Sequence, residues 1–421
     1  MEYKKIEKEK YNLHLINTDK FKTITIKVNF KRKLVKDEIT KRNLLVSVLT
    51  EGTLNYPSKR LMEIKTEELY DLAYRTINFQ TGKYSVLSFD MTFINEKYTE
   101  ENMNSESFKF LHELIYNPNI ENDAFNDINF NNAYKSMEDY LKSIKEDTIG
   151  YSQMRMLEEM KQDIISYRTV GYLEDLKNID SKSLYEYYLD IIKNDCIDIF
   201  VIGDFDNDLV ANLVDKYITV YDNKKIDDNH FYVPSNIDRK INVVREKVDK
   251  EQSTLVLGFI LDNLSDFEKR YVLSIYNYIL GGSTESNLFK TIREENSLCY
   301  YVTSSNQALI STSMIRLGIN AEDYDDALNL INMELNNMKN GNFDDSKIEN
   351  AKTIYINSLS ELEDNPDSII SLYTGIEYLK SDTIDVRKEK ILSVTKEDII
   401  NVANKIYLSV IYLLEGSDNN E

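Results

Sequence analysis

Tryptophan is absent from the 421-residue sequence, and cysteine, histidine, proline and glycine are scarce. The two cysteines, Cys196 and Cys299, are too few for a disulfide framework in a chain of this length, and they form no CxxC zinc or redox motif. Only four prolines and 12 glycines are present, which leaves little room for long loops. We therefore expect a chain that consists mostly of helices and strands.

Positive charge is also in deficit, because 72 acidic side chains outnumber 51 basic ones and give a formal net charge of −21. Such a chain repels phosphate backbones and anionic lipid headgroups, which argues against nucleic-acid and membrane-surface binding. No stretch approaches the ~20 apolar residues of a membrane helix, and the amino-terminal segment lacks the apolar core of a secretory signal. We expect a protein of the reducing cytoplasm.

Common catalytic motifs are missing as well. The sequence contains no GxSxG elbow, no GxGxxG turn and no GxxxxGK[ST] loop. Its three histidines are His14, His112 and His230, whereas a catalytic zinc normally needs at least two convergent imidazoles or thiolates. His112 and Glu113 are sequence neighbours and would point about 100° apart on a helix. We expect the histidines and cysteines to be ordinary core or surface residues.

What the sequence does contain is one pattern that occurs twice. Residues 23–30 alternate apolar and polar side chains, as a half-buried strand requires, and residues 253–259 resemble them. Each predicted strand precedes an apolar helix, and both helices, 37–51 and 266–280, end at glycine. Further matching segments follow in the same order, with Leu61 opposite Leu288.

The repeat has a period of roughly 215–230 residues, which is too long for a solenoid, so each copy is predicted to be a domain. The predicted domains are residues 1–220 and 240–421. The polar stretch 219–240, which contains Pro234 and has no sustained periodicity, is the predicted linker.

Residues 281–305 carry the most informative motif. This stretch resembles the second-domain signature of the M16 (pitrilysin/insulinase) metallopeptidase family, and residues 201–206 are similar to the end of that family's first domain. The matching residues are Gly281, Gly282, Ser286, Leu288, Phe289, Arg293, Glu294, Leu298 and Tyr300. The resemblance implies an α+β fold of the LuxS/M16 peptidase type. Each of two tandem homologous domains would have a mostly antiparallel sheet with helices packed on one face.

The sequence departs from this family at the zinc motif. Active members carry His-x-x-Glu-His in a first-domain helix, followed by Gly-Thr, with a third ligand, a Glu, on a later helix. With Gly52 in register, the three motif positions are Asn43, Val46 and Ser47. The distant ligand would fall on the helix that begins near residue 125, where Glu138 is the candidate. One carboxylate cannot hold a catalytic zinc without nitrogen ligands, so we expect no catalytic residue, metal or cofactor in this chain alone.

The resemblance retains a second pair of residues. In the family, the residues that match Arg293 and Tyr300 contact the peptide substrate near the scissile carbonyl. A guanidinium and a phenol both donate hydrogen bonds, which a carbonyl that is becoming an oxyanion needs. The resemblance therefore implies a substrate-binding role for Arg293 and Tyr300 in a shared site.

Two functional hypotheses follow. The first is an inactive M16 homologue that serves as the non-zinc, substrate-binding subunit of a heterodimer, in which the partner chain holds the zinc and the substrate is a peptide; self-association is also open. The second is a catalytically silent scaffold or binding protein. Residues 281–301 also resemble the M16B-like branch associated with aminopentanol modification of elongation factor P. A stand-alone zinc peptidase that uses other ligands is disfavoured.

Overall fold

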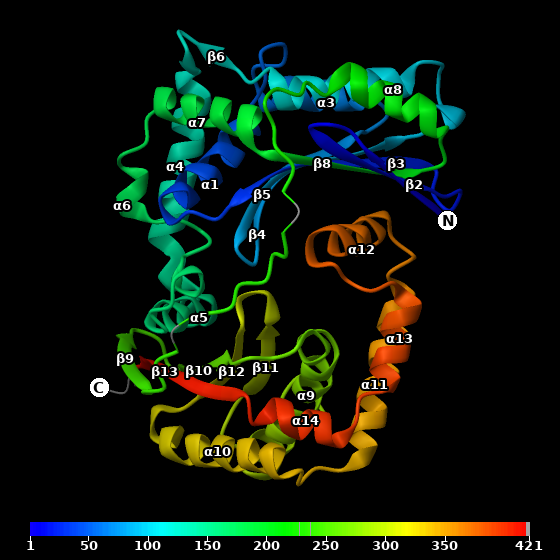
Figure 1. Cartoon of the computed structure of the whole chain (residues 1–421). Coiled ribbons are helices and arrows are strands. Elements are labelled where there is room, and N and C mark those ends of the chain that lie inside the picture. The colour runs from blue at the N-terminus through cyan, green and yellow to red at the C-terminus, as the bar shows by residue number, and fades with distance from the viewer. Residues whose placement is uncertain (227, 236, 418–421) are drawn as a thin grey trace. The chain divides into compact units, whose positions relative to one another are not determined.

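The computed structural model describes residues 1–226, 228–235 and 237–417. It forms two compact units (Figure 1). Unit 1 comprises Met1–Ser143, Arg168–His230 and Glu363–Lys380, and unit 2 comprises the remaining segments, Ile144–Tyr167, Phe231–Leu362 and Ser381–Glu421. The main change of unit, at His230 and Phe231, lies within the predicted linker. The predicted domains are continuous in sequence, whereas residues 144–167 and 363–380 each pack in the unit of the other half.

Unit 1 contains a six-stranded sheet in the order β1-β2-β8-β3-β5-β4. Its strands are β1 (Glu2–Glu7), β2 (Tyr11–Asn17), β3 (Thr23–Lys33), β4 (Ala73–Thr81), β5 (Tyr84–Ile94) and β8 (Cys196–Gly203). β2 and β8 pair in parallel, and the other neighbours are antiparallel. The strands at the two edges of the sheet are β1 and β4.

Helices of unit 1 lie on both sides of this sheet. Figure 1 shows α3 and α8 on one side and α12 on the other. The helices are α1 (Ile39–Leu49), α2 (Lys59–Glu68), α3 (Met103–Tyr116), α4 (Asp127–Ser143), α6 (Leu173–Leu176), α7 (Ser181–Asn194), α8 (Asn207–Tyr217) and α12 (Pro366–Leu379), with a short strand pair at β6 (Ile120–Glu121) and β7 (Ala124–Phe125). α12 comes from one of the exchanged segments, and its Ile369 and Ile370 pack in a small core with Phe200 of β8.

Unit 2 contains a five-stranded sheet in the order β11-β12-β10-β13-β9. Its strands are β9 (Asn242–Val248), β10 (Ser253–Leu261), β11 (Tyr301–Gln307), β12 (Thr312–Ile319) and β13 (Ile406–Gly416). Only β13 and β9 pair in parallel among these strands. The helices are α5 (Thr148–Glu159), α9 (Leu273–Leu280), α10 (Tyr324–Asn340), α11 (Asp345–Glu361), α13 (Ile384–Leu392) and α14 (Lys396–Ala403), together with π-helical segments at Glu268–Val272 and Phe289–Glu295.

The unit 2 sheet separates two apolar cores. Leu255 and Leu257 of β10 face the larger core, which α9, α10 and α14 close, while Val256 faces a smaller core with Met156 of α5. Figure 1 shows α10 and α5 on opposite sides of this sheet. A Cβ at Gly258 would lie 2.1 Å from the Met156 sulfur, so the close approach of α5 depends on a glycine in β10.

The predicted α+β fold with mostly antiparallel sheets is confirmed, and the structure adds a helix on the second face of each sheet. The reason lies in the central strands, because every residue of β8 and of β10 is buried. The matching of the two halves needs one adjustment. Leu288 is fully buried while Leu61 is 41% exposed, and the buried residue of α2 is Met62, which the burial pattern favours as the counterpart of Leu288. Among the described residues, no helix combines the length and apolar character that a membrane crossing requires.

The role of the exchanged helix α5 can be tested by truncating its buried methionine. We expect Met156→Ala to lower the free energy of unfolding by about 2–5 kcal/mol, because Met156 is fully buried and its loss leaves a cavity against β10. Met333→Ala on α10 is the matched control, and it should cost less than about 0.5 kcal/mol because Met333 is 44% exposed. Urea denaturation followed by circular dichroism measures both. Equal effects of the two substitutions would contradict the packing described for α5.

Candidate functional site at the α1 pocket

Two of the three expected zinc-motif positions line a cavity in unit 1. This cavity, the α1 pocket, has a volume of about 710 Å³, and Asn43 and Ser47 of α1 form part of its wall. The rest of the wall comes from β4 and β5, from α4 and from the loop at residues 169–170. The lining side chains are Leu34, Ile39, Asn43, Ser47, Asn78, Phe79, Gln80, Ser85, Ser136, Met137, Tyr140, Thr169 and Val170, all of them uncharged. The wall of the pocket is therefore uncharged and contains both polar and apolar side chains.

Asn43, which the resemblance aligns with the first imidazole ligand of the M16 motif, is part of a chain of hydrogen bonds. Its Nδ2 donates to the Thr169 carbonyl oxygen at 2.7 Å, and its Oδ1 accepts from Asn78 Nδ2 at 2.9 Å. Ser85 Oγ donates in turn to Asn78 Oδ1 at 2.9 Å. Both ends of the Asn43 amide are thus engaged with protein groups. These hydrogen bonds link α1 to β4 and to the loop at residues 169–170.

The other two motif positions supply no replacement chemistry. Ser47 lines the pocket, and its Oγ donates back to the Asn43 carbonyl oxygen at 3.4 Å, one turn earlier on α1. Val46 is half-buried and carries no group that could accept or donate a proton. Neither side chain therefore offers an imidazole or a carboxylate as a metal ligand or a general base.

The candidate for the distant ligand, Glu138, lies on α4 but does not line the pocket. Its carboxylate pairs with Lys135 at 3.4 Å and with Lys142 at 2.9 Å along the helix. Hydrogen bonds from Lys142 and Lys135 lower the pKa of Glu138, which stabilises it as a charged surface group. α4 instead presents Ser136, Met137 and Tyr140 to the pocket. These positions do not assemble the first shell of a catalytic zinc.

Arg293 and Tyr300 belong to unit 2 and lie at the surface there. Arg293 is exposed on the π-helical segment, with its guanidinium 4.9 Å from the centre of the Phe289 ring. Tyr300 is 65% exposed immediately before β11, and its backbone N–H donates to the Gly318 carbonyl oxygen at 3.0 Å. The neighbouring Ile292 and Cys299 are buried and hold the segment to the core. Both side chains therefore present hydrogen-bond donors to solvent from an anchored segment.

Comparisons with known proteins find one matching family model and several similar sequences. Residues 178–355 match the family described as Peptidase M16 inactive domain. The chain is also 29% identical over 414 residues to the protein of Bacillus subtilis (strain 168) named "Probable inactive metalloprotease YmfF", and the match covers 96% of both chains. The chain is thus similar over nearly its whole length to a protein that is named as an inactive metalloprotease. An "Uncharacterized zinc protease" of Rickettsia bellii (strain RML369-C) is 30% identical over 169 residues. This shorter match covers 38% of the chain and 40% of that protein.

Solved structures confirm the M16-like fold over the whole chain. A conserved protein from Enterococcus faecalis V583 is 27% identical, and the similarity covers all of both chains with a TM-score of 0.92. A peptidase M16 inactive domain from Pseudomonas fluorescens is similar over all of both chains with a TM-score of 0.79 and 14% identity. The second similarity concerns the fold alone.

Sequence reasoning named the M16 motif positions but missed their new partners. Asn78 and Thr169 are separated from Asn43 by 35 and 126 residues, and both are polar residues of common type. No local pattern marks either of them as a partner of Asn43. The one available signal was the simultaneous loss of the imidazoles and the general base, which shows that the pocket is free to acquire other contacts without naming them.

Restoring the motif on α1 should not create an M16 peptidase. We expect the triple variant Asn43→His, Val46→Glu, Ser47→His to show no zinc-dependent peptide hydrolysis, because α4 supplies no third ligand to the pocket. A fluorogenic peptide assay with added Zn²⁺ measures this, and the unmodified chain is the control. Hydrolysis by the triple variant that a chelator abolishes would show that the pocket retains a complete supporting shell.

Proposed function

We propose that this inactive M16 homologue is the non-zinc, substrate-binding subunit that complements a zinc-bearing M16 peptidase in peptide proteolysis. The observation that carries the proposal is the contrast between the two motifs. The three zinc-motif positions have lost all ligand and base chemistry, whereas Arg293 and Tyr300 remain as exposed donors on an anchored segment. In a complex, the zinc would be held by the partner chain.

The chemistry of the retained pair supports a role beside a reacting carbonyl. A guanidinium stays charged at any physiological pH, and a tyrosine hydroxyl donates a hydrogen bond below its pKa of about 10. Both groups can therefore stabilise negative charge on a carbonyl oxygen without a proton transfer of their own. They cannot activate water, so this chain depends on a partner for the nucleophile.

The α1 pocket and its neighbouring strand support peptide binding by unit 1. β4 is the terminal strand of the sheet, and its Asn78, Phe79 and Gln80 line the pocket. An extended peptide can hydrogen-bond to such an edge strand and place alternate side chains in an adjoining pocket. The neutral wall of the pocket favours an uncharged side chain over a charged one, because a buried charge would find no opposite charge there.

The state of the two cysteines is in keeping with a reducing cytoplasm, where we place the protein. Both thiols are free and buried. Burial raises the pKa of Cys196 to about 12 and that of Cys299 to about 11, so neither is a reactive thiolate at neutral pH. An adjacent gene for an intact His-x-x-Glu-His M16 chain would identify the partner.

The alternative function is that of a catalytically silent scaffold, associated with a protein-modification pathway of the elongation factor P type. This function is favoured by the hydrogen bonds of the Asn43 amide to Thr169 and Asn78, which occupy both of its polar atoms. The α1 pocket remains, but no reacting group lines it. A scaffold needs binding surfaces and no donors at a transition state. The two functions therefore differ in what they demand of Arg293 and Tyr300.

Substitution of the retained pair in a mixed complex separates these functions. In the complex with a zinc-bearing M16 chain, Arg293→Ala or Tyr300→Phe should lower kcat by about 10²–10³, the typical effect of losing one preorganised donor. Assembly and the partner's zinc content should stay unchanged. The matched controls are Arg60→Ala and Tyr98→Phe, which alter an exposed arginine and a 54% exposed tyrosine outside the motif.

Steady-state kinetics on a peptide substrate, size-exclusion chromatography and elemental analysis provide the readouts. If both motif variants retain the kcat of the unsubstituted complex, the pair has no part in turnover and the scaffold function is correct. If only the Arg60 and Tyr98 variants retain it, the complementing function stands.

A further inference from the structure

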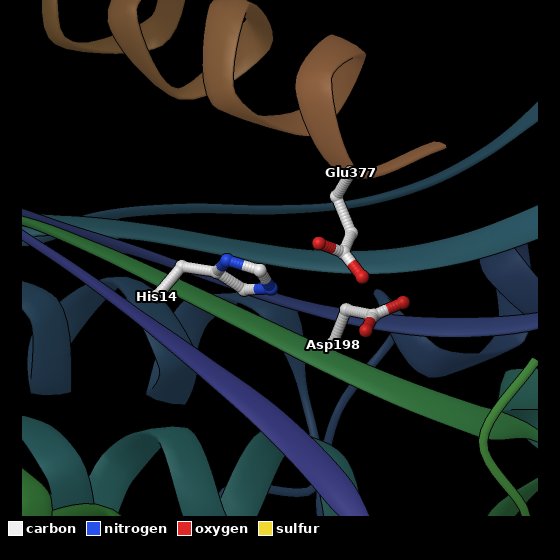
Figure 2. A group of neighbouring side chains, drawn as sticks. All are labelled: His14, Asp198 and Glu377. Carbon is white, nitrogen blue, oxygen red and sulfur yellow. The ribbon is translucent and has the colours of Figure 1, made fainter. Parts of the chain in front are cut away.

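A group of three potential metal ligands lies in unit 1 and is separate from the residues that line the α1 pocket. His14 comes from β2, Asp198 from β8 and Glu377 from α12, and one ligand atom from each lies within 4.8 Å of those of the other two. Figure 2 shows the imidazole edge of His14 and the two carboxylates converging on one point. It is the one such group among the described residues.

The sheet and the exchanged helix bring these residues together. β2 and β8 pair in parallel with His14 opposite Phe200 and Asn12 opposite Asp198, so His14 and Asp198 share one face, two residues apart in register. α12 packs against that face and contributes Glu377 from above (Figure 2). Three segments of the chain that are far apart in sequence thus meet at one place.

His14 is arranged as a metal-binding histidine is. Its side chain is fully buried and stacks on Phe200 at 4.2 Å between ring centres. Nδ1 is hydrogen-bonded to the Tyr3 hydroxyl at 2.8 Å, while the buried Nε2 has no hydrogen-bond partner and faces the carboxylates (Figure 2). Burial lowers the pKa of His14 to about 4, so the imidazole is neutral at physiological pH. Nε2 can bind a metal when Nδ1 carries the proton and donates it to the Tyr3 oxygen, which corresponds to the usual second-shell arrangement.

Two lysines balance the carboxylates in the metal-free site. Asp198 is fully buried, accepts from Asn12 Nδ2 at 2.8 Å and lies 3.3 Å from Lys31 Nζ. Glu377 accepts from Lys5 Nζ with both oxygens at 3.0 Å. Lys5 also lies 3.3 Å from Glu7, and its side chain is 28% exposed, so it has a second partner and a path to water when it leaves Glu377.

We propose that His14 Nε2, Asp198 and Glu377 bind one divalent ion of the zinc or cobalt type, and that Lys5 leaves Glu377 when the ion enters. Zinc accepts one imidazole and two carboxylates at about 2.0–2.2 Å, which places neighbouring ligand atoms of a tetrahedron about 3.4 Å apart. The three atoms would have to approach one another by at most about 1.4 Å, within reach of rotamer changes at Asp198 and Glu377. Lys31 remains beside Asp198 and offsets part of its charge.

Such an ion would hold α12 in place on the unit 1 sheet. The helices before and after α12 in the chain, α11 and α13, belong to unit 2, whereas α12 itself packs in unit 1. A bond from Glu377 to an ion held by β2 and β8 would fix α12 to the sheet that it covers. The role is structural, and it is independent of the proposed complementation of a zinc-bearing partner.

This site differs from the expectation that the chain binds no metal. That expectation concerned the M16 positions on α1 and treated the three histidines as ordinary residues. It could not include ligands from three distant segments, because His14 and Asp198 meet only through strand pairing and Glu377 arrives on an exchanged helix. The α1 positions still lack a first shell.

Metal titration of the full-length, chelator-treated chain tests the site. We expect Co²⁺ to bind at one ion per chain with a visible d–d absorption spectrum, Zn²⁺ to displace it, and Zn²⁺ to raise Tm. His14→Phe keeps the ring that stacks on Phe200, and Glu377→Gln keeps the side-chain length. Each should weaken Zn²⁺ binding by at least about tenfold. The matched controls, His112→Phe on α3 and Glu363→Gln at an exposed ion pair with Lys20, should bind as the unsubstituted chain does.

A substitution that should strengthen Zn²⁺ binding makes the test independent of folding defects, because a folding defect would weaken binding. Lys5→Met should strengthen Zn²⁺ binding by roughly fivefold, because it removes the cation that competes for Glu377, a partly exposed ion pair of modest strength. The proposal is wrong if the unsubstituted chain binds neither ion, or if His14→Phe and Glu377→Gln bind as tightly as their controls. It is equally wrong if Lys5→Met leaves the affinity unchanged.

Discussion

The rest of the structure depends on one constraint: each of the two sheets is buried on both of its faces. The helices from the same half of the chain mostly cover one face of their sheet and leave the second face uncovered. The central strands β8 and β10 have no exposed residue on either side. Left uncovered, the second face would expose Phe200 and Ile202 in unit 1 and Val256 in unit 2 to water, and in each unit a helix packs on these residues. That helix comes from the other half of the chain in both units, α12 in unit 1 and α5 in unit 2.

The exchanged helix α12 also affects which polar and charged side chains can be buried in unit 1. The face of the unit 1 sheet under α12 carries His14, Lys31 and Asp198 in addition to apolar side chains. Buried charges are tolerated only when opposite charges or hydrogen bonds compensate them, and α12 contributes Glu377 and Tyr378 to that compensation. The α1 pocket has the opposite character. Its wall is uncharged, and both ends of the Asn43 amide are hydrogen-bonded to other protein groups.

Much of the fold could be predicted from the sequence because its signals are local. Period-two alternation identified the strand around residues 23–30, similarity to that segment identified the strand around residues 253–259, and Gly281 marked the end of α9. The exchange of residues 144–167 and 363–380 could not be predicted, because an amphipathic helix shows which of its faces is apolar but not which sheet that face covers. The offset between Leu61 and Met62 has the same origin, since one step along a helix exchanges a buried for an exposed position.

The candidate site was predictable to the same degree. The absence of an imidazole or a carboxylate at Asn43, Val46 and Ser47 follows directly from the sequence, whereas the Asn43–Asn78 link and the convergence of His14 with Glu377 depend on tertiary contacts. The central claim is that this chain contributes to peptide hydrolysis only through a zinc-bearing partner. The most direct measurement is peptide cleavage by the purified chain, by the purified partner and by an equimolar mixture at one total protein concentration. The account predicts turnover by the mixture well above that of the partner and none by this chain. Cleavage by this chain alone, or a mixture no faster than the partner, would contradict it.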